Sequence, residues 1–163
     1  MKLSKIEKIL GGNKFFDRII QDRMDLIEIS EKGLTKEAVT HFAKYLDLSN
    51  QQISEILPVT ARTLQRHHLK QRFNAVISEH VLLIAEVAAK GTAVFGSRAN
   101  FLPWMKLPCL ALGNRTPLSL LKTKFGIDMV IDELGRIEHG IISLFIPVKI
   151  YLYVHFLIEL GNL

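Results

Sequence analysis

The chain has 163 residues, of which 48% are hydrophobic and 23% are charged, and its net charge is +5. This balance excludes a disordered chain and allows one domain with a core or two small ones. The single cysteine, Cys109, excludes an intramolecular disulfide and a multi-cysteine zinc site, and the histidines lack metal-ligand spacing. No long apolar run follows the N-terminal lysines, so we expect no signal peptide and a cytoplasmic protein.

The N-terminal part is predicted to contain two helices after a short lead. Residues 1–13 form a lysine-bearing lead that we expect to be mobile at its tip. Apolar residues from Phe16 to Ile27 recur at helical spacing and predict an amphipathic helix, ended by Gly33, whose apolar face packs in a core or a dimer contact. Thr35 is expected to cap the next helix.

Two helices joined by a tight turn follow, at the spacing of a helix-turn-helix. Ser49 and Gln52 predict a capping box for the first helix, which Pro58 should end. Thr60 should cap the second helix, which we expect to span Ala61 to about Leu69.

The second of these helices carries residue types that contact base edges and phosphates. Residues 56–73 hold four Lys or Arg and no acidic residue, which suits a polyanion. A plain helical hairpin with a solvated basic face is the alternative. The predicted DNA contacts are Arg62, Thr63, Gln65 and Arg66.

A longer helix is predicted from Ser78 to about Phe95, and its alanine-rich stripe is typical of a central or dimer helix. Pro103 should make the next segment short or kinked, ending at Trp104 as a core anchor.

Closely spaced helix boundaries follow the tryptophan. Residues 112–114 predict a turn, and Thr116 with Pro117 predicts a helix start. Gly126 and Gly140 are each expected at a left-handed helix stop. The two short helices expected here span about 117–124 and 128–139.

Several motifs occur together at fixed spacing: T-A-R-T-L-Q-R at 60–66, V-F-G at 94–96, Trp104, A-L-G-N-R-T-P-L-S-L-L at 111–121 and L-G-R-I-E-H-G at 134–140. With them the chain resembles, over about residues 26–141, the Xre-like antitoxins of the MbcA/ParS type, which bacteria encode beside RES-domain toxins.

The resemblance implies an all-α fold with a helix-turn-helix head, a small helical toxin-binding module and a tail of unknown conformation. The expected divisions are a DNA-binding region at 1–73, a connecting or dimer helix at 74–96, the toxin-binding module at 97–141 and an apolar tail at 142–163.

The resemblance also implies a non-enzymatic antitoxin of a type II toxin–antitoxin system. It would bind and neutralise a RES-domain toxin and repress its own operon by binding operator DNA, as a homodimer. Toxins of this type consume NAD⁺, so the cofactor belongs to the partner and none is expected here. The residues carried over to the toxin contact are Leu134, Arg136, Ile137, Glu138 and Gly140.

The tail departs from the family, because such antitoxins end near the position of Gly140. Residues 141–158 are nearly all apolar, yet Lys149 near the centre of a membrane helix would cost about 2.5–3.5 kcal/mol. A membrane helix, a strand-rich segment and an accidental extension of the reading frame remain open for it.

Two other functions remain open: a stand-alone helix-turn-helix regulator, and a membrane-tethered adaptor that uses residues 142–163. An enzyme is the least expected class, because no Gly-rich phosphate loop, metal cluster or nucleophile with a spaced base is visible.

Overall fold

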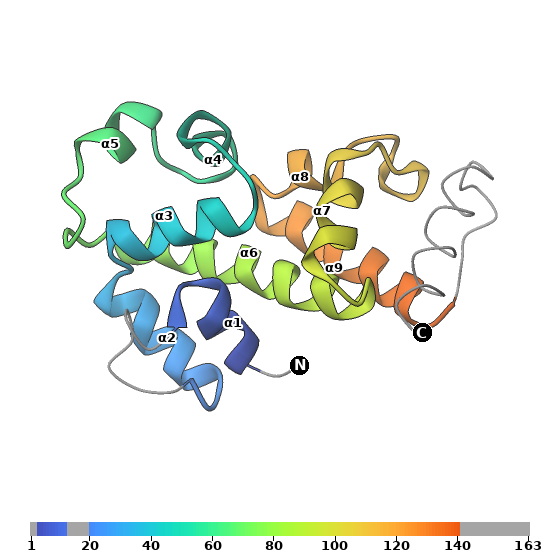
Figure 1. Ribbon diagram of the computed structural model, residues 1–163, viewed down its shortest axis with the longest axis horizontal. Helices are drawn as coiled ribbons and strands as arrows, with labels where there is room; N and C mark the ends of the chain where they lie inside the picture. The colour runs from blue at the N-terminus through green and yellow to red at the C-terminus, as the bar shows by residue number, and fades with distance from the viewer. Residues whose placement is uncertain (1–2, 13–19, 141–163) are drawn as a thin grey trace. The chain divides into compact units, whose positions relative to one another are not determined.

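The computed structural model describes residues 3–12 and 20–140. These residues form nine α-helices and one short 3-10 helix without a β-strand, which confirms the all-α prediction for this part of the chain (Figure 1). The predicted tail at 142–163 lies outside them. The chain divides into two compact units, one up to Ala89 and the other from Lys90 onward.

The first unit is built from short helices. They are α1 (Ser4–Ile9), α2 (Arg23–Lys32), α3 (Lys36–Tyr45), α4 (Asn50–Ile56), α5 (Ala61–Arg66) and most of α6 (Ala75–Val94). Helix α1 packs against α3, and α4 packs against α5 (Figure 1). Fully buried side chains from five of these helices form the core, including Ile6, Phe42, Ile53, Leu64 and Ile84.

Side-chain caps fix where several of these helices begin, as predicted. The Thr35 hydroxyl accepts a hydrogen bond from the backbone N–H of Ala38 at 3.3 Å. Ser49 and Gln52 form the expected capping box. The Thr60 hydroxyl accepts from the N–H of Thr63 at 3.1 Å, but α5 ends at Arg66, not near Leu69, because the backbone is extended at the next residue.

The structure differs from the sequence prediction at two places near the N-terminus. Helix α1 lies within the segment that we expected to be a lead, and its Ile6 and Ile9 are buried in the core. The next helix starts only at Arg23, because Asp22 forms a capping box there. Its residues Met24 and Ile27 are exposed and do not form a core face, while residues 13–19 of the predicted helix lie outside the described part.

Helix α6 starts one turn earlier than predicted. The Asn74 side chain accepts from the N–H of Ile77 at 3.0 Å and caps this start. Ser78, where we expected the helix to begin, is buried within it, and its hydroxyl accepts from the N–H of Leu34 at 2.8 Å.

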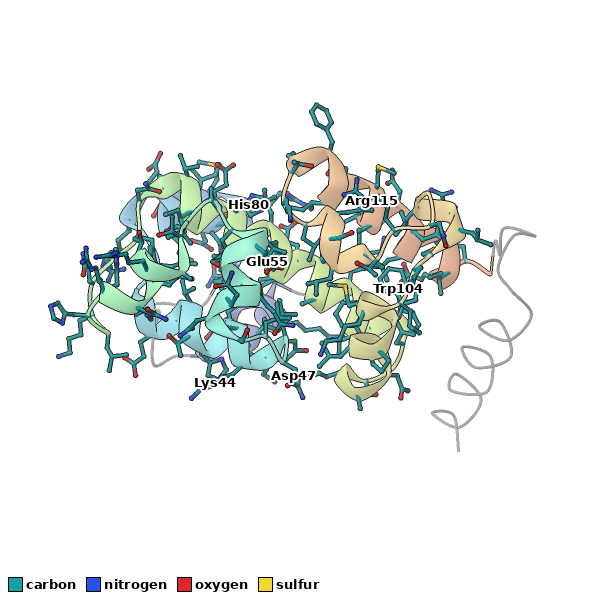
Figure 2. The ribbon with its side chains drawn as sticks, turned by 90° about the horizontal axis from the view of Figure 1, so that it is seen from above. Lys44, Asp47, Glu55, His80, Trp104 and Arg115 are labelled. Carbon is teal, nitrogen blue, oxygen red and sulfur yellow. The ribbon has the colours of Figure 1, made fainter. Side chains whose placement is uncertain are left out.

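The second unit contains the end of α6, α7 (Arg98–Lys106), the 3-10 helix η2 (Leu110–Leu112), α8 (Pro117–Leu120) and α9 (Lys124–Glu138). Trp104, labelled in Figure 2, is buried as predicted, with its ring centroid 5.5 Å from that of Phe95 and 6.1 Å from that of Phe101. Helix α7 continues through Pro103 without ending there.

The prediction for Gly126 was wrong. It is not a left-handed stop but part of the first turn of α9, where its N–H donates to the Thr123 hydroxyl at 3.1 Å. A Cβ at this position would lie 2.0 Å from the Leu120 carbonyl oxygen. Glycine therefore allows the backbones of α8 and α9 to approach closely. Helix α8 is also shorter than predicted. Gly140 has the expected left-handed backbone, with φ +65°.

Among the described residues, no single helix is both long and apolar enough to cross a membrane. Helices α6 and α7 are long and apolar enough only when they are taken together, and the chain bends by 117° between them.

We predict that Gly126→Ala lowers the free energy of unfolding by about 1–3 kcal/mol, the usual cost of overpacking. The reason is the contact with the rigid Leu120 backbone. Gly135→Ala in the same helix is the control, because its Cβ would meet only the flexible end of Lys90 at 3.3 Å. The control should gain up to about 1 kcal/mol from helix propensity. Urea denaturation measures both, and equal stabilities would contradict the prediction.

Candidate functional site

The first candidate site is the outer face of α5. Arg62, Gln65 and Arg66 are all exposed there, and they span roughly 100° of the helix circumference. The Thr63 side chain is partly buried, and its hydroxyl lies 2.9 Å from the Thr60 hydroxyl. The structure therefore brings three of the predicted DNA contacts onto one surface and places the fourth in the helix cap.

Helix α5 is held in place by residues that the sequence analysis did not single out. Its inner residue Leu64 is buried, and the carbonyl of that residue accepts a hydrogen bond from the Lys36 ammonium. Burial lowers the pKa of Lys36. His67 Nδ1 lies 3.0 Å from the Thr63 carbonyl oxygen, and its ring stacks on Phe73 with centroids 4.4 Å apart. These contacts satisfy carbonyls at the end of a helix that is only six residues long.

The second candidate site is the C-terminal end of α9. Arg136, Glu138 and Gly140 are exposed, and Ile137 is half-buried. Leu134 is 0% exposed and lies in the core, so it has no surface to offer a partner. Four of the five residues predicted for the toxin contact are thus accessible, and the role of the fifth is packing.

A buried carboxylate lies beneath this end of the helix. Glu133 is 2% exposed, and among the described residues its Oε2 accepts no hydrogen bond. The Nε of Arg136 lies 3.2 Å from that oxygen. The two groups form an ion pair, but the geometry is not that of a hydrogen bond. A second pair, between Lys90 and Glu138, is longer at 3.9 Å. Sequence spacing missed Glu133, because its burial depends on how α9 packs.

Cys109 lies close enough to this pair to sense its charges. It immediately precedes η2, which packs on α9, and its N–H donates to the Arg115 carbonyl at 3.0 Å. Burial and the negative charge of Glu133 raise the pKa of the thiol, and Arg136 lowers it. Among the described residues no cluster of His, Cys, Asp and Glu could hold a metal ion.

Two family models match these two parts of the chain. The one described as the antitoxin Xre-like helix-turn-helix domain matches residues 25–86. The one described as the antitoxin Xre/MbcA/ParS C-terminal toxin-binding domain matches residues 90–140.

Whole proteins with the name Antitoxin Xre are similar over most of the chain. The protein from Yersinia enterocolitica is 28% identical over 120 residues, which cover 72% of this chain and 81% of that protein. The protein from Photorhabdus laumondii is 31% identical over 117 residues, which cover 71% of this chain and 79% of that protein. The chain belongs to the Xre family of antitoxins.

Each candidate site lies within one of the two matched domains. Helix α5 lies in the helix-turn-helix domain, which implies DNA binding, and α9 lies in the toxin-binding domain, which implies a toxin partner. The family supports a type II antitoxin.

We predict that Glu133→Gln speeds alkylation of Cys109 by iodoacetamide at pH 8, and that Arg136→Gln slows it. Removing the negative charge lowers the pKa of the thiol, and removing the positive charge raises it. Cys109 is the only cysteine, so total labelling reports this site alone. The urea-unfolded chains should all react at one rate. A shift of both folded variants in the same direction would contradict the electrostatic account.

Proposed function

We propose that this chain neutralises a RES-domain toxin that consumes NAD⁺, and that it represses its own operon as a homodimer. The observation that carries the proposal is the division of the chain into a helix-turn-helix match and a toxin-binding match, each with an exposed set of charged residues. The toxin, and not this chain, binds the nucleotide. The RES class comes from the resemblance of the motifs at 60–66, 111–121 and 134–140.

In the DNA-binding arm, α5 enters the major groove. Its arginines reach base edges or phosphates, and Gln65 can pair with adenine. Lys36 does not touch DNA but fixes the C-terminal end of α5 by its hydrogen bond to the Leu64 carbonyl. Two copies would place two such helices on successive turns of the operator.

In the toxin-binding arm, the end of α9 covers the toxin's active site. Arg136 contributes a planar cation with its terminal nitrogens directed to the partner, because its Nε is paired with Glu133. Ile137, Glu138 and Gly140 complete the contact surface.

We predict that Arg62→Ala and Arg66→Ala each weaken binding to the chain's own promoter by about 1–3 kcal/mol where the arginine contacts a base. Where it contacts a phosphate, the slope of log affinity against log salt should fall by about one. Arg115→Ala is the matched control, because this exposed arginine lies in the toxin-binding domain. Fluorescence anisotropy over a salt series measures both quantities. Unchanged affinity and slope in both variants would remove α5 from the DNA interface.

We predict that co-expression of the full chain restores NAD⁺ in cells that produce the RES-domain protein encoded beside it. Arg136→Glu should abolish this rescue, because it reverses the charge at the contact. Lys122→Glu is the control, since it makes the same charge change at an exposed position before α9. If NAD⁺ stays depleted with the wild-type chain, this protein does not neutralise that toxin. A stand-alone regulator would still bind its promoter.

A further inference from the structure

The outer face of α9 carries a stripe that begins far from its C-terminal end. Its members follow each other at steps of four, three and four residues, which keeps them on one side of a helix. They are Phe125, Met129, Asp132 and Arg136. All four are exposed, with Phe125 at 84% and Met129 at 45%.

The packing of α9 does not explain the two apolar members of this stripe. The core side of the helix is formed by Ile127, Val130 and Leu134, which are all buried. Phe125 lies in the first turn, where the Thr123 cap fixes the backbone. An exposed phenylalanine leaves a large apolar surface in water, and an exposed methionine one turn later enlarges it. Single exposed hydrophobic residues are common, but a pair next to a charged contact marks a candidate interface.

We infer that the toxin docks along the whole outer face of α9, with Phe125 and Met129 as apolar anchors and Arg136 as the charged contact. The inference rests on the proposed function. The toxin is the occupant because α9 lies entirely within the domain matched as toxin-binding, and because the stripe continues to the end of the helix proposed above to cover the toxin. From Phe125 to Arg136 the stripe rises by roughly 16 Å.

This geometry defines which chemical groups the toxin surface must present to the stripe. Phe125 and Met129 require an apolar pocket, where a central aromatic anchor gives most of the binding energy. About three helical turns further on, Arg136 requires a carboxylate. Glu133 holds the Nε of that arginine at 3.2 Å, which leaves its two terminal nitrogens for a bidentate pair with the partner.

The test uses the full chain and the purified RES-domain protein encoded beside it. We expect the double variant Phe125→Ser/Met129→Ser to weaken toxin affinity at least tenfold, as loss of a hot spot does. Its thermal midpoint and promoter affinity should stay unchanged, because both side chains are exposed. Met24→Ser is the matched control, since this methionine is also exposed, at 60%, but lies on α2 of the first unit. Isothermal calorimetry measures toxin binding.

Toxin affinity equal to that of the wild-type chain would overturn the inference. If the variant also loses self-association in sedimentation, a second copy covers the stripe instead of the toxin. A wild-type chain that binds no toxin would instead overturn the proposed function. Within the stripe, Arg136→Lys should bind the toxin more weakly than the wild-type chain although it keeps the positive charge, because an ammonium cannot make the bidentate pair.

Discussion

The fold depends on fixing the ends of helices that are too short to be stable alone. Isolated helices below about 12–15 residues are marginal in water, and α5 has six residues and α8 has four. Each therefore needs a side-chain cap at its start and a buried face. In α5, the Thr60 cap, the buried Leu64 and the Lys36 contact together set the direction of the exposed arginines. The position of the proposed DNA contacts on α5 therefore depends on these three interactions.

Local chemistry made the caps predictable. A hydroxyl that accepts from an N–H three residues later leaves a pattern in the sequence, so Thr35, Ser49, Thr60 and Thr116 were each assigned correctly. Ser78 shows the limit of that reasoning. Its hydroxyl is used within a helix to satisfy the N–H of Leu34, which is 44 residues away. A long-range hydrogen bond has no local signature.

The glycines and the exposed apolar residues show the same limit. Gly126 satisfies the pattern of a helix stop, but its real constraint is the Leu120 carbonyl of the preceding helix. Helical periodicity groups apolar residues but does not say which group faces the core. Met24 and Ile27 therefore do not pack in the core, which was one of the two predicted roles, and Phe125 was not singled out. For the sites, the outward arginines of α5 followed from its cap and periodicity. The burial of Glu133 and Leu134 required the packed structure.

The Glu133–Arg136 pair explains how a buried charge can be compatible with binding a partner. A buried carboxylate without compensation is costly, and among the described residues Oε2 accepts no hydrogen bond. If the proposed toxin contact required the arginine to leave the glutamate, binding would incur that cost. Because the contact uses Nε, the terminal nitrogens can bind a second carboxylate while the first pair stays intact. The half-exposed guanidinium can therefore keep its ion pair with the buried carboxylate while it binds the partner.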